Sequence, residues 1–189
     1  LTEVINILLT HLSKDILECK GTIDKYMGDC IMAFWNAPLI NENHPDDAIE
    51  SGRKMMATMK TVNHLIKESG DINFDLKIGI GIGTGDCVVG NMGSDQRFDY
   101  TVLGDVVNLS SRLEGQTKSY GVTTIISSNT SSVKTKSFSL NPTFLQILGI
   151  EYFLAISILS FVPKPFKLII LILSFRMGLI FFSSLKEKI

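Results

Sequence analysis

The run from Gly21 to Pro38, GTIDKYMGDCIMAFWNAP, constrains the fold more than any other part of this 189-residue chain. Polar and apolar residues mix before the pair Gly28-Asp29, and an apolar stretch follows it. A glycine followed by an aspartate is a favoured two-residue connection between antiparallel strands. The run therefore predicts a β-hairpin with the carboxylate of Asp29 at its tip.

The rest of the N-terminal two thirds mixes helical and strand-like patterns. Apolar residues at helical spacing predict helices over residues 3–19, 45–70 and 105–119, and a short helix at 128–136. Apolar or alternating runs predict strands at residues 74–82, 98–103 and 122–126. Thr84-Gly85-Asp86 predicts a turn into a second hairpin over residues 87–90. Because no regular βαβ alternation is present, an α+β fold is favoured over a doubly wound sheet.

Composition excludes several classes of function. The formal net charge is −1, which argues against nucleic acid as the main partner. The cysteines Cys19, Cys30 and Cys87 are far apart and form no CxxC pair, which argues against a disulfide framework or a zinc site and favours a reducing compartment. The glycines of residues 79–85 form neither GxGxxG nor a P-loop, so neither nucleotide-binding motif is present there.

Two charged residues of the predicted hairpin are candidates for chemistry. Asp29 could hold a divalent metal, because Mg²⁺ is commonly bound by one or two carboxylates together with substrate phosphates. The simpler interpretation is that Gly28-Asp29 only makes the turn. Lys25 lies three residues before Gly28, and an exposed strand lysine without a function is the commoner case.

A second stretch, Arg97 to Glu114 (RFDYTVLGDVVNLSSRLE), adds weight to the first. Together and in this order, the two runs resemble the signatures of the class III nucleotide cyclases, which make cyclic AMP or cyclic GMP. The resemblance covers residues 3–136. It implies an α+β, ferredoxin-like cyclase fold that is incomplete at both ends, with an antiparallel sheet, helices on one face and a β-hairpin arm.

The resemblance implies that Lys25 and Thr101 contact the purine. Members that use ATP have lysine at the position of Lys25, whereas members that use GTP have glutamate. A lysine can donate to adenine N1, and a threonine hydroxyl can accept from the adenine amino group. The pair resembles the ATP-using, bacterial-type subgroup, although strand propensity alone could account for Thr101.

Asn108 and Arg112 are four residues apart on a predicted helix and therefore share a face. In the family pattern, here GDVVNLSSR, the asparagine orients the ribose and the arginine stabilises the charged phosphorus centre. Arginine suits this role because it is always protonated and its fork-shaped head matches phosphate oxygens. A solvated helix face is the alternative, and Asp105 is expected to cap or begin the helix rather than bind metal.

The implied activity is conversion of ATP to 3′,5′-cyclic AMP and pyrophosphate with two Mg²⁺ or Mn²⁺ ions. The implied partner is a second copy of the domain in a head-to-tail homodimer. In that arrangement Lys25 and Asp29 come from one subunit, and Thr101, Asn108 and Arg112 from the other. The alternative is a non-catalytic cyclase-like module that dimerises or binds nucleotide to regulate a partner. A cytoplasmic catalytic domain is expected, in a parent protein that could be attached to a membrane.

Two parts of the family pattern have no counterpart here. The family begins with a strand that carries a first metal-binding aspartate, ahead of the helix that opens this chain. It ends with strands that carry a lysine for the triphosphate, whereas the match here fades by about Phe138. The chain is therefore expected to be a truncated domain, over residues 1–136, that makes no measurable cyclic AMP by itself.

Residues 137–189 form a hydrophobic tail of different composition, with eight of the eleven phenylalanines of the chain. Its apolar runs, 144–162 and 168–182, are separated by Lys164 and Lys167. A membrane hairpin is possible in principle, because the first run has transmembrane length, although Glu151 lies within it. The favoured interpretation is a frameshifted or aberrant sequence, since the tail replaces the strands expected there.

Overall fold

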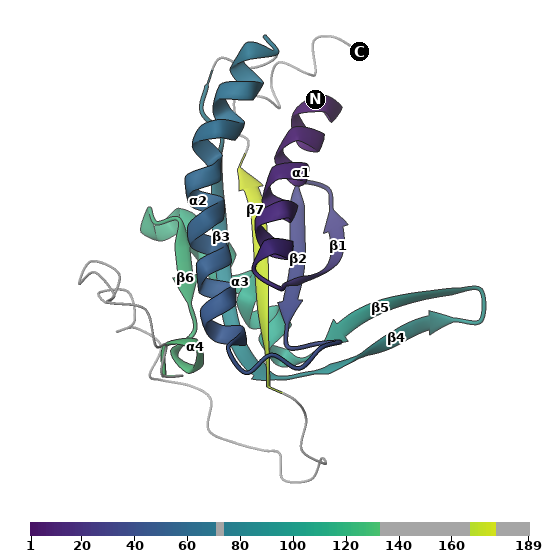
Figure 1. Ribbon diagram of the computed structural model, residues 1–189. Helices are drawn as coiled ribbons and strands as arrows, with labels where there is room; N and C mark the ends of the chain where they lie inside the picture. The colour runs from purple at the N-terminus through teal and green to yellow at the C-terminus, as the bar shows by residue number, and fades with distance from the viewer. Residues whose placement is uncertain (71–73, 133–166, 177–189) are drawn as a thin grey trace.

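The computed structural model describes residues 1–70, 74–132 and 167–176 (Figure 1). The elements in chain order are α1 (Thr2–Glu18), β1 (Thr22–Met27), β2 (Cys30–Trp35), α2 (His44–Glu68), β3 (Lys77–Asp86), β4 (Val88–Ser94), β5 (Arg97–Leu103), α3 (Asp105–Tyr120), β6 (Thr124–Ile126), α4 (Ser128–Ser132) and β7 (Lys167–Arg176). The mixed α+β composition and the three long helices agree with the sequence-based expectation.

Five of the strands form one sheet in the order β1-β2-β7-β3-β6, and β4 and β5 form a separate two-stranded ribbon. Neighbours from β1 to β3 are antiparallel, whereas β6 runs parallel to β3. The expectation of an antiparallel sheet is therefore wrong for β6. A parallel neighbour requires a crossover connection, and α3 lies between β3 and β6 in the chain and supplies part of one.

Strand β7 comes from the C-terminal tail and lies between β2 and β3 (Figure 1). Residues Ile169–Leu173 pair with Trp35–Ile31, and the whole of β7 pairs with the whole of β3. The described sheet is continuous because of this strand. The first apolar run of the tail, 144–162, lies outside the described residues. Among the helices that the structure describes, none combines the length and the hydropathy needed to cross a membrane.

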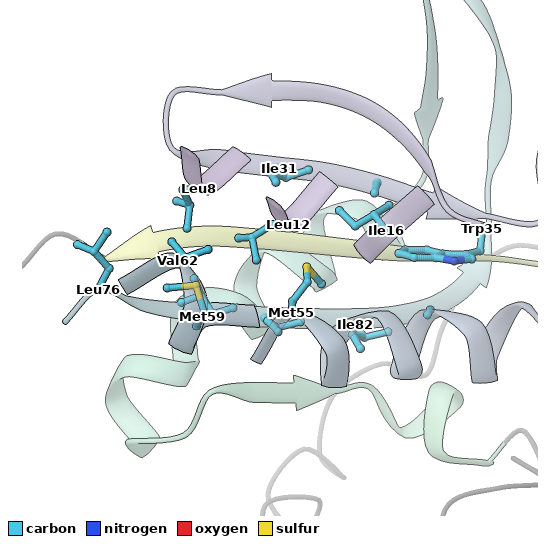
Figure 2. Close-up of a cluster of buried hydrophobic side chains, with 14 of the residues drawn as sticks. Leu8, Leu12, Ile16, Ile31, Trp35, Met55, Met59, Val62, Leu76 and Ile82 are labelled. Atoms are coloured by element: carbon cyan, nitrogen blue, oxygen red, sulfur yellow. The ribbon is translucent and has the colours of Figure 1, made fainter. Parts of the chain in front are cut away.

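Helices cover both faces of the sheet, so the expectation of helices on one face is wrong. On one face α1 and α2 pack against alternate residues of β2, Ile31 and Trp35 among them (Figure 2). On the other face Met32 and Phe34 of β2 pack against Val102 of β5 and Val106 of α3. The reason is that β2 is apolar at consecutive positions, and a strand with two apolar faces needs cover on both.

The glycines of β3 let α3 approach the sheet closely. A Cβ atom at Gly81 would overlap the carbonyl oxygen of Ser110 in α3, and one at Gly85 would lie 3.1 Å from Cβ of Val106. The strand therefore continues through Gly85 to Asp86, and the turn expected at residues 84–86 does not occur. The second hairpin is instead formed by β4 and β5, which protrude from the body as an arm (Figure 1).

Candidate functional site

Asp29 lies where the sequence places it, in the two-residue turn between β1 and β2. Met27 pairs with Cys30 across the turn, and Gly28 has a φ of +64°, in the left-handed region that favours glycine. The carboxylate of Asp29 is half-buried beside the start of β2. The predicted hairpin is confirmed, and its tip presents one acidic side chain.

The surroundings of Asp29 are both apolar and acidic. The pKa of the Cys30 thiol is raised to about 11, first by burial and then by the carboxylates of Glu114 and Asp29. Within the described ranges no group of three or more His, Cys, Asp or Glu residues could hold a metal. A single carboxylate fits a magnesium-type ion that is shared with nucleotide phosphates, rather than an ion held in a cage of protein ligands alone.

Lys25 and Thr101 meet at a residue that the sequence analysis passed over, Asp24. The hydroxyl of Thr101 in β5 donates to Oδ2 of Asp24 at 2.6 Å. The ammonium of Lys25 lies 3.3 Å from Oδ1 of the same carboxylate. Both purine-binding candidates therefore share one carboxylate within a single chain, whereas the expected homodimer would take them from two subunits.

Asn108 and Arg112 lie on the exposed face of α3, as expected. Val106, Ser110 and Leu113 are the buried face of that helix. The Nε of Arg112 donates to the backbone oxygen of Asn108 at 3.4 Å, so the guanidinium lies beside the asparagine. Asp105 is the first residue of α3, after Gly104, which confirms the expectation that it begins the helix.

The predicted residues thus form three groups. Lys25 and Thr101 are joined through Asp24, Asn108 and Arg112 share one surface of α3, and Asp29 lies at the hairpin tip. The second group follows the first closely in the chain, because α3 starts four residues after Thr101. An exposed helix face with an arginine and an amide can bind a phosphorylated ligand that reaches it from solvent.

Sequence reasoning missed Asp24 because its position depends on an irregularity of β1. Ile23 pairs with Ala33 but Lys25 pairs with Met32, so Asp24 is an extra residue in a β-bulge. Period-two alternation through residues 22–27 places Asp24 and Lys25 on opposite faces and gives no reason to connect them. The one available signal was an acidic residue directly before Lys25 in a strand beside a core.

Comparison with known proteins finds relatives over the part of the chain that contains the candidate site residues. A model of the Adenylate and Guanylate cyclase catalytic domain matches residues 2–145. Adenylate cyclase 1 of Rhizobium meliloti (strain 1021) is 37% identical over 107 residues, which are 57% of this chain and 16% of that protein. An adenylate cyclase of Anabaena cylindrica is 37% identical over 124 residues, 65% of this chain and 24% of that protein. The chain thus spans less than a quarter of the length of these two relatives.

Solved structures agree with the sequence comparisons. The crystal structure of the guanylyl cyclase Cya2 matches with a TM-score of 0.65 and 29% identity, over 91% of this chain and 79% of that one. The crystal structure of the adenylyl cyclase CyaB from P. aeruginosa matches with a TM-score of 0.63 and 30% identity, over 94% of this chain and 83% of that one. The chain belongs to the family of adenylate and guanylate cyclase catalytic domains.

Proposed function

We propose that the chain is the catalytic part of an adenylate cyclase, which converts ATP to 3′,5′-cyclic AMP and pyrophosphate. In this reaction the 3′-oxygen of the ribose forms a bond to the α-phosphorus and loses its proton. The bond from the α-phosphorus to the bridging oxygen breaks, and pyrophosphate leaves. The observation that carries the choice of ATP is the convergence of Lys25 and Thr101 on Asp24.

The two residues match the edge of adenine. The lysine ammonium offers only donors, and adenine N1 is an acceptor. The threonine oxygen can accept from the adenine amino group. Guanine presents an N–H at N1 and a carbonyl oxygen at C6, so the same pair would leave donors facing donors at N1. The side chain of Lys25 is 41% exposed and can therefore reach a base that enters from solvent.

The phosphate end of the substrate would lie along α3. Arg112 would bind the α-phosphate oxygens, where negative charge develops in the transition state, and Asn108 would hold the ribose. Asp29 would hold a divalent ion together with the triphosphate, and such an ion supplies positive charge to the phosphate oxygens when it is bound. The guanidinium is exposed, so it is free to approach a bound nucleotide.

A second copy of the domain would complete the site. The arm carries large apolar side chains that are exposed in the single chain, including Phe98 at 62% and Leu103 at 61%. Large apolar side chains that are exposed on a protruding ribbon are typical of a surface that another protein covers. In the homodimer Asp29 of one subunit would face Asn108 and Arg112 of the other, and Lys25 would stay with Thr101.

Arg112→Ala tests the proposal. Turnover is measured in a restored domain, defined as residues 1–136 flanked by the first strand and the terminal strands of the P. aeruginosa adenylyl cyclase. We expect kcat to fall about 10²–10³-fold with a smaller change in KM, because the guanidinium acts mainly in the transition state. Arg53→Ala, an exposed arginine of α2 that is paired with Glu50, is the matched control.

Mixing two inactive variants tests the shared site. Asp29→Ala and Arg112→Ala subunits should recover part of the activity when combined, because a heterodimer keeps one intact site. No recovery from dimers that are shown to mix would contradict a site between subunits. Binding of ATP by a folded, restored domain without any cyclic product would instead favour the non-catalytic regulatory module.

A further inference from the structure

Asp24 is a fully buried carboxylate whose two oxygens have different surroundings. Its side chain is 0% exposed. Oδ2 accepts hydrogen bonds from the Thr101 hydroxyl at 2.6 Å and from the Val102 amide at 3.3 Å. Oδ1 has no hydrogen-bond partner among the described residues, although the Lys25 ammonium lies 3.3 Å away. The lysine is thus close enough for an ion pair but is not aligned as a hydrogen-bond donor.

The carboxylate of Asp24 lies between β1 of the main sheet and β5 of the arm. The bulge at Asp24 inserts one residue into β1 and changes the direction in which its side chain points. The Val102 amide, from β5, then anchors Oδ2. A buried acid is costly unless it is paired and hydrogen-bonded, so a carboxylate that keeps one oxygen unsatisfied needs an explanation.

The contact with Thr101 determines what that hydroxyl can do. A threonine hydroxyl has one hydrogen to donate and two lone pairs that accept. Its hydrogen is directed at Asp24, so toward a ligand the oxygen is an acceptor only. An acceptor suits the amino group of adenine and opposes the carbonyl oxygen that guanine has at the same position.

We propose that Asp24 is a positioning residue that sets base preference, by fixing the Thr101 hydroxyl as an acceptor and holding Lys25 beside it. The inference rests on the proposed cyclase function and extends it, because it assigns the selection of adenine to a residue that itself touches no nucleotide. Lys25 keeps further N–H groups for adenine N1 while its ammonium lies at Oδ1.

A purely structural role is the competing explanation. Asp24 ties β1 to β5, so its loss could loosen the arm and weaken the binding of every nucleotide. Such an effect lowers the affinity for adenine and guanine nucleotides alike. The ratio of the two affinities therefore separates the roles, because it changes only if the direction of the Thr101 hydroxyl or the position of Lys25 changes.

A double-mutant cycle in the 189-residue chain tests the proposal. Asp24→Asn removes the charge at nearly constant shape, and Thr101→Val removes the hydroxyl. Affinities for the α,β-methylene analogues of ATP and GTP, which lack the scissile oxygen bridge, are measured by calorimetry. We expect each variant to reduce the preference for the ATP analogue about tenfold, the order of one correctly directed hydrogen bond. The double variant should show no greater loss of preference than Asp24→Asn alone.

Several outcomes separate the claims. An unchanged ratio in Asp24→Asn, or additive losses in the double variant, would overturn the role of Asp24 while leaving the adenylate cyclase proposal intact. An unmodified chain that prefers the GTP analogue would overturn both. Asp99→Asn, an exposed carboxylate of β5 that pairs with Arg97, is the control and should leave the ratio unchanged.

A measurement on the unmodified chain covers the case in which Asp24→Asn does not fold. A Thr101 hydroxyl proton that is held by a buried carboxylate exchanges slowly with water. It therefore gives a persistent resonance in the proton NMR spectrum. Its observation, together with a cross-peak to the Val102 amide, would support the proposal. A hydroxyl proton in fast exchange in the folded chain would overturn it.

Discussion

At the scale of a single residue, the proposed choice between the two purines depends most simply on Lys25. Its ammonium is held at the rim of a buried carboxylate rather than extended freely into solvent. Arginine or glutamine would offer donors as well, but neither would have the same charge and reach. Substitution at this one position therefore tests base recognition without disturbing the core.

Lys25→Glu should weaken binding of the ATP analogue by about tenfold or more, because an acceptor would then face adenine N1. Lys25→Met separates loss of the donor from gain of a negative charge beside Asp24. Lys60→Glu, at an exposed position of α2, is the control. Calorimetry with the 189-residue chain measures the effect. Unchanged affinity of Lys25→Glu for the ATP analogue would mean that Lys25 is an ordinary strand lysine without a role in base recognition.

Cys30 reports on the environment of the hairpin tip. Burial and the carboxylates of Glu114 and Asp29 raise the pKa of this thiol from 9.0 to about 11. A rise of that size lowers the thiolate fraction at pH 8 roughly a hundredfold, and the thiolate is the reactive form. Alkylation by iodoacetamide, followed by mass spectrometry, should be correspondingly slow at Cys30 in the folded chain. Equal rates in buffer and in urea would contradict the described environment.

The contact between α3 and β3 matters most at the scale of elements, because it positions Asn108 and Arg112. Ser110 and Glu114 of α3 press their backbone against Gly81, where no side chain is present. The helix can lie this close only because β3 carries glycine there. The distance between α3, which carries Asn108 and Arg112, and the sheet therefore depends on the absence of one methyl group at Gly81.

Gly81→Ala should lower the free energy of unfolding by about 1–3 kcal/mol or more, because the new Cβ overlaps backbone atoms that cannot move independently. Gly90→Ala, in β4, is the matched control, since nothing lies within 4 Å of its Cβ position. Urea denaturation of both variants measures the difference. Equal stability of Gly81→Ala and the unmodified chain would mean that α3 does not approach β3 as described.

The same elements show what a sequence can predict here. Helices α1, α2 and α3 follow from local periodicity and from Gly21, Gly70 and Gly121, and the structure places them within two residues of expectation. The turn predicted at residues 84–86 is absent, and the chain continues there as strand β3. Gly85 leaves room for Val106 of α3 and does not change the direction of the chain. Local patterns cannot reveal this, since the partner is more than twenty residues away in the chain.

The candidate site divides in the same way. Asp29 and the shared face of Asn108 and Arg112 were predictable, because turn chemistry and helical spacing are local. The link between Asp24 and Thr101 spans 77 residues and depends on a bulge, so no local rule points to it. Strand β7 is also a long-range result, because its pairing with β2 joins residues near 31 and 173.

At the scale of the whole molecule, the arm formed by β4 and β5 is the feature that most favours a second subunit. It leaves the body of the domain as two strands (Figure 1). Large apolar side chains of these strands, Phe98 and Leu103 among them, are exposed in the single chain. Such a ribbon gains little by itself, because two strands alone are marginally stable in water. A second subunit that covers it would both stabilise the arm and bring a second Asp29 toward the first α3.

Phe98→Asp should therefore weaken dimerisation strongly, because it places a charge in a surface that the dimer would bury. Leu39→Asp is the control, at a residue that is 82% exposed and lies outside the arm. Sedimentation equilibrium should show dimers for the unmodified chain and for the control, and mainly monomers for Phe98→Asp. Dimers that persist in Phe98→Asp would place the interface elsewhere.

The most direct test of the adenylate cyclase assignment is the product that the restored domain makes from equal concentrations of ATP and GTP with Mn²⁺. Mass spectrometry distinguishes cyclic AMP from cyclic GMP in one sample, so both substrates compete under the same conditions. The pairing of Lys25 and Thr101 at Asp24 leads us to expect cyclic AMP as the main product. Cyclic GMP in equal or greater amount would contradict this account of the purine site.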